Sequence, residues 1–459
     1  MGESVSSRPL RLRVGLLAAV YMVLVWLSYR HLIAPSFAYL GYTAEPIDAD
    51  LALYCAALGL LPIAWMPLSF DRSTKFVYWL VYLFVIIPAG VISPGVLETE
   101  TGRWVGYYAE IILGFWIIQI GYVIDLELVP RFAFYLPKQI FWVGVAGLCV
   151  LNYGAVFMQF GLALRLGLLT NLLSAELTAT RLEARQAFES SGIALSGYCL
   201  TWQSGVVNPF LIAYGSVHRQ RVHLVAGLFG QLVLFSVAAS KSMLISSLIV
   251  WLCIYLLNER RRHRAAPGLM AAVIGVVSLG GAHQLMTGSI DLNSVLARRA
   301  IMTPAVLTRY YFDFFATNPK THLSQSVLGW LFDYPYVRSI PRTVGAEYVG
   351  DATSANANFF ADAFANFGIA GVVAFSLLLS GLFLLIDVNS HETDVRLASA
   401  VLVVAGMSLV NSALLTSLLT HGVLLAMLML ISLDGRDDST SLAVATLRSR
   451  RDPLPAGAA

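Results

Sequence analysis

Residues 359–387 read FFADAFANFGIAGVVAFSLLLSGLFLLID, and Asp362 and Asp387 are the only charged residues in this stretch. Its length and apolar composition predict a transmembrane helix, because the hydrocarbon core of a bilayer requires roughly 20 predominantly apolar residues of helix. A helix is favoured over a strand because backbone groups in lipid must form hydrogen bonds within their own segment. The stretch therefore indicates an integral membrane protein.

The composition of the whole chain agrees with this interpretation. Of its 459 residues, 58% are hydrophobic and only 12% are charged, whereas a soluble domain carries about 25% charged residues. The net charge of +3 is too small to argue for a nucleic-acid partner. The four cysteines all fall inside apolar runs, which excludes a disulfide framework and a cysteine-based zinc site. The basic start, Arg8 to Arg13, leads into an apolar stretch and is interpreted as a retained signal anchor.

Further segments of the same kind recur along the chain and predict an all-α polytopic protein with about twelve spans. The segments lie near 14–34, 51–70, 76–95, 105–124, 139–161, 192–215, 222–239, 242–257, 267–287, 359–387, 397–414 and 416–433. The seventh and eighth are joined by a very tight turn, as are the eleventh and twelfth. Under this count every basic short loop, such as Arg260 to Arg264, falls on one side, which the positive-inside rule assigns to the cytoplasm. Both termini are then cytoplasmic.

The predicted organisation places two extended segments outside the cytoplasm. The parts are N-terminal spans 1–161, a first outer loop 162–191, spans 192–287, a large outer loop 288–358, spans 359–433 and a cytoplasmic tail 434–459. Long structured loops in a compact protein are usually functional. The two outer loops are therefore where candidate site residues are sought.

The first outer loop predicts an amphipathic interfacial helix that carries two arginines. Its leucines recur at helical spacing, and Arg181 and Arg185 follow four residues apart on one helical face. Two guanidinium groups on one face can hold a diphosphate, since each offers a planar fork of donors. The alternative is a pair of ordinary interfacial arginines, with Arg185 paired to Glu189.

The second outer loop combines arginines with aromatic residues, which suits a site for sugars and phosphates. The candidate anion-binding arginines are Arg298, Arg299, Arg309, Arg338 and Arg342. The alternative is a small cap with Tyr and Trp at the membrane interface. Lys241, in the tight turn before the eighth span, is either a further contact for a lipid phosphate or a snorkelling interfacial lysine.

Carboxylates and amides cluster where the second outer loop enters the next span. Asp351 and Asp362 are the candidate catalytic bases, and Asn356 and Asn358 are candidates to orient a sugar or phosphate. Asp362 and Asn366 share one face of an apolar span, where polar groups are costly and usually line a cavity. The alternatives are helix capping by the residues before the span, and helix–helix hydrogen bonding by Asp362.

This stretch resembles the Wzy-type O-antigen polymerases, the oligosaccharide repeat-unit polymerases of bacterial envelopes. The resemblance rests on residues 354–371, on 310–319 with its Phe-Phe and Asn-Pro pairs, and on the Ser-Lys-Ser entry to the eighth span at 240–242. The span count and the two outer loops fit as well. In the related O-antigen ligases a His-Asn pair opens the corresponding helix, whereas this chain has Asn356 and Asn358 and no histidine there.

The resemblance implies an enzyme at the periplasmic face of the inner membrane. It would transfer a growing glycan from undecaprenyl diphosphate onto an incoming lipid-linked repeat unit, without a metal or another cofactor. The fold would resemble that of the membrane-embedded, lipid-dependent (GT-C-like) glycosyltransferases, and a chain-length regulator would be a possible protein partner. No nucleic-acid partner is expected.

Three other interpretations compete with the polymerase. A flippase or transporter explains the spans but not the long second loop, and no matching pair of Gly/Pro-broken helices indicates inverted repeats. An O-antigen ligase is disfavoured by the missing histidine. A purely structural membrane partner does not explain the arginine-rich loops.

Overall fold

The computed structural model describes residues 7–98, 100–132, 134, 136–161, 165, 167, 180 and 194–433. Among these residues the regular elements are all helices and no strand occurs, in agreement with the predicted fold class. Arg181 and Arg185 lie outside the described residues, as does the leucine pattern of the first outer loop.

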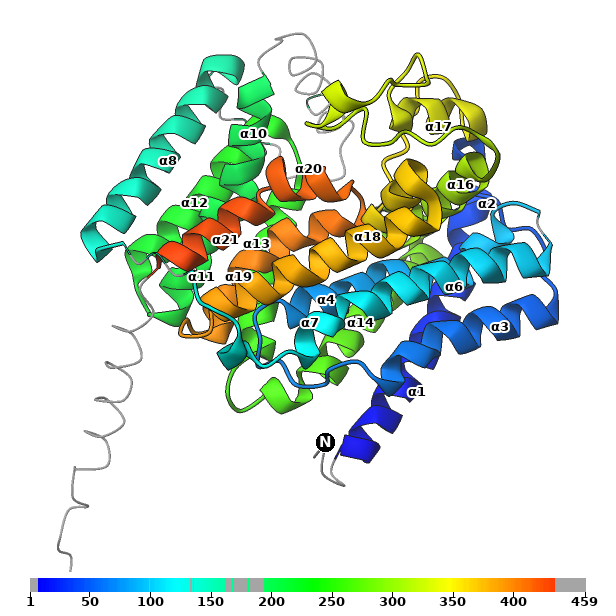
Figure 1. Ribbon diagram of the computed structural model, residues 1–459, viewed down its shortest axis with the longest axis horizontal. Coiled ribbons are helices and arrows are strands. Elements are labelled where there is room, and N and C mark those ends of the chain that lie inside the picture. Colours follow the sequence, from blue (N-terminus) through cyan, green and yellow to red (C-terminus); the bar gives the residue numbers. More distant parts are fainter. Residues whose placement is uncertain are drawn as a thin grey trace, which may run out of the picture.

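The main helices lie side by side, and the segments between α14 and α18 gather at one end of them (Figure 1). The helices before this region are α1 (Ser7–Ser28), α2 (Ala34–Phe37), α3 (Ala49–Leu60), α4 (Lys75–Val81), α5 (Ile87–Val91), α6 (Thr101–Ile118), α7 (Ile120–Val123), α8 (Lys138–Phe160), α10 (Ala194–Trp202), α11 (Asn208–Val217), α12 (Arg221–Ala238), α13 (Lys241–Leu256) and α14 (Ala265–Thr287). Those that follow are α15 (Asp291–Asn293), α16 (Thr303–Thr317), α17 (Ile340–Tyr348), α18 (Phe359–Asn389), α19 (Val395–Gly406), α20 (Leu414–Leu419) and α21 (Val423–Ser432).

Seven helical stretches of the described chain are long and apolar enough to cross a membrane. They are Arg8–Leu40, Lys75–Gly95, Thr101–Val123, Lys138–Phe160, Arg221–Ala238, Arg262–Thr287 and Phe359–Asn389. Shorter apolar helices cover Ala49–Ala64, Lys241–Leu256, Val395–Val410 and Val423–Ser432. The protein therefore has the make-up of a multi-pass membrane protein, while the full count of twelve spans stays a prediction.

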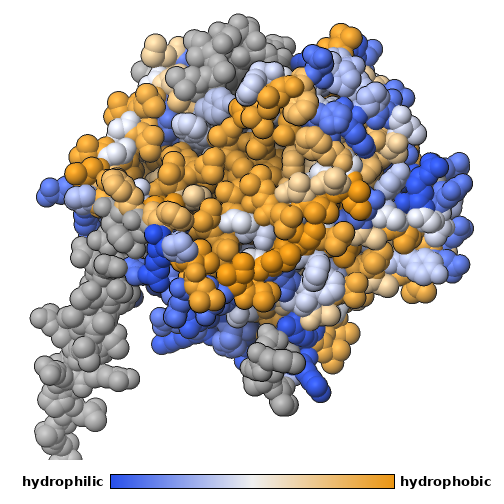
Figure 2. Space-filling view, in the orientation of Figure 1, coloured by the Kyte–Doolittle hydropathy of each residue, from blue (hydrophilic) through white to orange (hydrophobic). Residues whose placement is uncertain are grey.

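The outer surface of the helices is apolar, as it must be to face lipid. Hydrophobic residues gather across the middle of the face that carries α18 and α21, and hydrophilic residues gather toward its margins (Figure 2). On α8, Val143 and Val150 are 72% and 75% exposed, and Val222 on α12 is 78% exposed. Side chains of this kind are stable at a surface only in an apolar solvent or against a partner.

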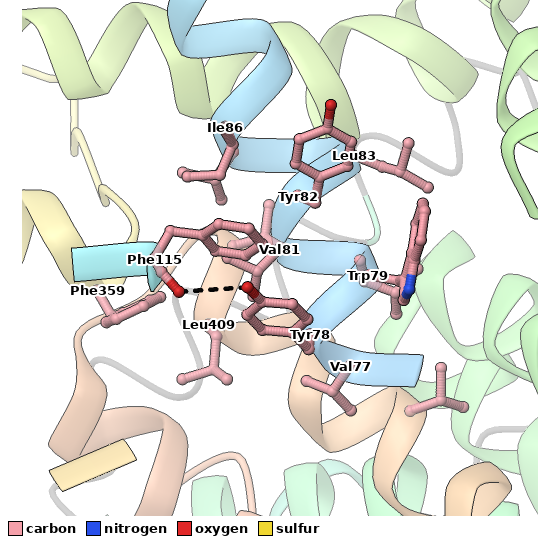
Figure 3. Close-up of a cluster of buried hydrophobic side chains, with 14 of the residues drawn as sticks. Val77, Tyr78, Trp79, Val81, Tyr82, Leu83, Ile86, Phe115, Phe359 and Leu409 are labelled. Carbon is pink, nitrogen blue, oxygen red and sulfur yellow. Dashed lines mark hydrogen bonds between the residues drawn. The ribbon is translucent and has the colours of Figure 1, made fainter. Parts of the chain in front are cut away.

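The centre of the bundle is the helical stretch Lys75–Gly95, which is buried on nearly all sides. Figure 3 shows its aromatic side chains packed against neighbouring helices. The Tyr78 ring stacks on Phe115 of α6 with ring centroids 4.2 Å apart, and the Tyr78 hydroxyl donates to the Phe115 carbonyl at 3.4 Å. The arrangement supplies buried apolar contact and a partner for the phenol.

A fully bonded carboxylate joins the far end of α18 to the start of this central helix. Asp387 is 2% exposed, and its Oδ1 accepts hydrogen bonds from the Ser73 hydroxyl at 2.9 Å and the Thr74 amide at 3.0 Å. Its Oδ2 accepts from the Thr74 hydroxyl at 2.7 Å. Asp387 thus satisfies backbone and side-chain donors just before α4 begins.

A neutral polar network connects α8 to the following helices. The Asn152 amide donates to Gln203 at 3.0 Å, and Gln203 donates to Asn208 at 2.8 Å. The Tyr153 hydroxyl also donates to Asn208, at 3.0 Å. Gln203 opens a π-helical turn, Gln203–Val207, between α10 and α11. These hydrogen bonds favour the association of apolar helices, because apolar side chains alone gain little by exchanging contact with lipid for contact with another helix.

α18 is interrupted near its start, which the sequence analysis did not predict. Phe367 has φ −143° and ψ 18°, and Gly368 has φ 60° and ψ −145°, so the helix divides into a short first part, 359–366, and a long second part. Gly368 lies in the left-handed region that favours glycine. At Gly371 a Cβ atom would lie 2.1 Å from the Ala363 carbonyl oxygen, so the two parts approach too closely there for a larger residue.

The end of the chain also departs from the prediction of two spans joined by a tight turn at 414–416. α19 and a 3₁₀ turn end at Val410, and α21 begins only at Val423. The short helix α20 lies between them. By contrast, the tight turn predicted between the seventh and eighth segments is present, with α12 ending at Ala238 and α13 beginning at Lys241.

Candidate functional site

A cavity of about 520 Å³ lies where the first part of α18 meets α16, α17 and α20. The volume is in the range typical of sites for small ligands. Its described lining residues come from six segments that are distant in sequence. They are Tyr198, Tyr311, Leu323, Gln325, Ser326, Val327, Ile340, Pro341, Asn356, Ala357, Asp362, Asn366, Ser412, Ala413, Leu415, Thr416, Leu419 and Thr420.

Asp362 is the only charged side chain among the described residues that line this cavity. It stands in the first turn of α18 and is partly exposed, toward the cavity. The Asn366 amide donates to the Asp362 carboxylate at 3.2 Å and to its backbone carbonyl at 2.9 Å. The Leu414 amide is a further hydrogen-bond donor to this carboxylate. The carboxylate also borders the cavity, so it can be reached by a ligand there.

Neutral hydrogen-bonding groups surround this carboxylate. Tyr311 on α16 donates its hydroxyl to the Ala355 carbonyl at 2.8 Å. Burial, together with the nearby Asp362 carboxylate, raises the pKa of Tyr311 well above its usual range, so this hydroxyl stays protonated at neutral pH. Amides and hydroxyls from the other segments, together with apolar side chains such as Leu323, Val327 and Leu415, complete the lining.

The loop 321–323 forms hydrogen bonds to the last residues of the first part of α18, where the helix is interrupted. The Thr321 and His322 amides donate to the Ala365 and Asn366 carbonyls at 3.1 and 3.3 Å. The Thr321 hydroxyl and the Leu323 amide donate to the Asn366 side-chain oxygen at 2.9 and 2.7 Å. Carbonyl groups that lose their helical partners at the interruption are thus bonded again.

This loop holds two non-glycine residues in the left-handed region. His322 has φ 47° and Leu323 has φ 62°. Each such residue costs roughly 1–2 kcal/mol, because its Cβ lies too close to the following carbonyl oxygen. Strained backbone of this kind persists only where surrounding contacts fix it, and it clusters at functional sites.

Four site residues were predicted in or just before α18, and two of them line the cavity. Asp362 and Asn356 line it. Asn358 is fully buried instead and caps α18, where its Oδ1 accepts from the Phe360 and Ala361 amides at 3.0 and 3.1 Å. Asp351 is 84% exposed and pairs with Arg338 at 2.5 Å, away from the lining residues.

Arg309 has a structural position rather than a place in the cavity. Its side chain is 1% exposed and lies over the Trp104 ring at 5.1 Å. It donates to the Glu98 carbonyl at 3.3 Å and approaches Asp313 at 3.6 Å. The expectation that Arg309 binds a diphosphate therefore does not fit its burial, because α16 turns this residue into the protein.

The other predicted cations also lie outside the described lining of the cavity. Arg298 donates to Ser294 at 2.9 Å and lies 4.1 Å from the centre of the Phe37 ring. Arg299 is exposed on the same π-helical segment, Ser294–Met302. Arg342 is exposed on α17, directly after the lining residue Pro341. Lys241 starts α13.

Several lining residues carried no signal in the sequence. Tyr198, Thr416 and Thr420 are ordinary polar residues within or beside apolar segments, and only the packing of α10 and α20 brings them to Asp362. Gln325 and Ser326 belong to the second outer loop, where arginines and aromatic residues give the stronger signal in the sequence. Gly368 and Gly371 are the sequence signal for the interruption in α18, since the first has a positive φ and the second allows the close approach.

No three His, Cys, Asp or Glu side chains in the described part of the chain are grouped so that they could hold a metal ion. Comparisons with protein-family models, with curated proteins and with solved structures return no match to this chain.

Proposed function

We propose that this protein is a lipid-diphosphate-dependent glycosyltransferase that polymerises oligosaccharide repeat units at the periplasmic face of a bacterial inner membrane. In this proposal it has twelve spans, cytoplasmic termini and a GT-C-like architecture. The observation that supports it most is the cavity in which one carboxylate, Asp362, stands among neutral hydrogen-bonding groups.

The cavity would hold the acceptor sugar at the nonreducing end of an incoming lipid-linked repeat. Asp362 would take the proton from one acceptor hydroxyl as general base. The hydroxyl oxygen would then bond to the anomeric carbon of the donor glycan while the bond from that carbon to the lipid diphosphate breaks. The lipid diphosphate would leave with the bonding electron pair.

Charge that develops on the diphosphate needs cations near the rim of the cavity. Arg342 is the best placed of the described candidates, because it adjoins Pro341 in the lining. Arg181 and Arg185 of the first outer loop remain candidates from the sequence. Arg309 is removed from this role, since its guanidinium is buried against Trp104.

A lipid-linked oligosaccharide flippase is the second candidate, and one observation favours it. Interrupted helices that border a cavity are also how many transporters form substrate sites, and α18 is interrupted beside Asp362. The flippase does not require a carboxylate poised to accept a proton from a hydroxyl, so the polymerase is preferred.

An assay with purified protein and its native undecaprenyl-diphosphate-linked repeat separates the two. The polymerase predicts a ladder of longer glycans without added metal or nucleotide sugar. Absence of a ladder, together with movement of the same lipid between the leaflets of liposomes, would identify a transporter and reject the polymerase. A single new product, formed only when a lipid A-type acceptor is added to the lipid-linked repeat, would identify a ligase.

A further inference from the structure

Lys320 lies on the side of α18 that faces away from the cavity. Its ammonium group is 3.8 Å from the centre of the Phe364 ring and donates a hydrogen bond to the Phe315 carbonyl at 2.5 Å. Phe364 is two residues from both Asp362 and Asn366, so it projects from the other side of this helical segment. The lysine therefore contacts the same short segment that carries Asp362, from behind.

The residues that follow Lys320 reach around the interruption to the cavity side. Thr321, His322 and Leu323 together donate five hydrogen bonds to Ala365 and Asn366. Asn366 in turn donates to the Asp362 carboxylate at 3.2 Å. The backbone from Lys320 to Leu323, with the hydrogen bonds to Asn366 and from Asn366 to Asp362, thus connects the lysine behind α18 to the carboxylate in the cavity.

The strained geometry of this loop requires an anchor on each side. His322 and Leu323 both have positive φ angles, and in this conformation both amides donate to Asn366 at the end of the first part of α18. The hydrogen bonds from Thr321, His322 and Leu323 to Asn366 are the first anchor. The contacts of the Lys320 ammonium group with the Phe364 ring and the Phe315 carbonyl are the second. Without the ammonium group the second anchor is lost, and the strain favours release of the loop.

We infer that Lys320 is a positioning residue: its ammonium group fixes residues 320–323 against the interruption in α18 and thereby orients Asn366 and the Asp362 carboxylate. The catalytic part of this inference rests on the proposed function. The structural part, the anchoring of the loop, does not.

The charge state of Lys320 gives the inference a distinct pH signature. Burial lowers the pKa of Lys320 to about 8, partly offset by Glu110 on α6. α16 presents the Phe315 carbonyl, and α18 presents the Phe364 ring and Gly368, so Glu110 is the titratable partner among the described elements around it. The ammonium form is present below this pKa and is lost as the pH rises through it.

The test compares wild type, Lys320→Met, Lys320→Arg and the matched control Lys138→Met, whose lysine is exposed at the start of α8. In Lys320→Met we expect kcat and kcat/KM to fall together by about 10- to 100-fold, because a misplacement of about 1 Å costs roughly 100-fold in rate. Lys320→Arg should restore most of the rate. Lys138→Met should match wild type.

The pH profile separates positioning from a general structural role. Wild type should lose activity with an alkaline limb near pH 8. Lys320→Arg should lack this limb up to pH 10, and Lys320→Met should be slow without it. An unchanged alkaline limb in Lys320→Met, or full activity of that variant, would overturn the inference.

Hydrogen exchange provides a readout that does not depend on activity. In Lys320→Met, amides in peptides that cover 321–323 should exchange faster than in wild type, while those of α13 stay unchanged. Wild-type protein that makes no ladder but shows this difference would reject the proposed function and retain the anchor. A wild-type ladder with unchanged exchange in Lys320→Met would reject the anchor and retain the polymerase.

Discussion

The two carboxylates of α18 have the same chemistry and opposite environments. Asp387, near the end of the helix, accepts three hydrogen bonds from Ser73 and Thr74 and is 2% exposed. Asp362, in the first turn, accepts from the Asn366 side-chain amide at 3.2 Å and from the Leu414 backbone amide, and it borders a cavity. A buried acid with both oxygens hydrogen-bonded to protein donors stabilises a structure, whereas an acid that borders a cavity is available for chemistry.

The strongest test of this comparison is Asp362→Asn. Under the proposed function we expect kcat to fall by about 10²- to 10⁴-fold, the usual contribution of a general base, with the thermal midpoint in detergent nearly unchanged. Glycan ladders quantified over time measure the rate. Wild-type rates in this variant would assign Asp362 to helix packing.

Asp387→Asn should do the reverse. The amide can replace only part of the bonding to Ser73 and Thr74, so we expect the free energy of unfolding to fall by about 1–3 kcal/mol. Thermal melting of the purified variant measures the loss, and the rate per folded molecule should equal that of wild type. A stable but inactive Asp387→Asn protein would contradict the comparison.

Gly371→Ala tests whether the interruption near Asp362 depends on the close approach of the two parts of α18. Its Cβ would lie 2.1 Å from the Ala363 carbonyl, so we expect a loss of about 1–3 kcal/mol in stability and reduced activity. Gly381→Ala, on the same helix with nothing within 4 Å, is the matched control and should be neutral or slightly stabilising. Equal effects of the two changes would show that the approach is not limiting.

The smallest effect is expected at a third carboxylate, Asp351. Its pair with Arg338 is exposed on both sides, and such pairs contribute about 0–1 kcal/mol. We therefore expect Asp351→Asn to retain nearly wild-type stability and glycan synthesis. A loss of activity comparable to that of Asp362→Asn would return Asp351 to the list of candidate bases.

Apolar segment length was sufficient to predict the helical membrane fold, because lipid leaves the backbone few alternatives. It was not sufficient to predict where helices stop. The segments 397–414 and 416–433 are continuous in composition, yet tertiary packing inserts α20 between them. The interruption of α18 likewise depends on loop 321–323, which bonds the freed carbonyls and lies far away in sequence.

For the site, depth within an apolar span correctly singled out Asp362 and Asn366 as cavity residues. The same reasoning could not distinguish Asn356, which lines the cavity, from Asn358, which caps the helix two residues later. Arginine content in the second outer loop did not identify residues that line this cavity, because residue type does not reveal which way a helix turns its side chains. Arg309 shows this most clearly, since α16 directs it toward Trp104.

The polar network on α8 has a consequence for biosynthesis. Asn152 bonds to Gln203, which is synthesised 51 residues later, and Asn208 follows shortly after. An amide without a partner in hydrocarbon is unfavourable. α8 is therefore synthesised before its polar partner exists, and only the later π-helical turn at Gln203 supplies that partner and joins α8 to α10 and α11.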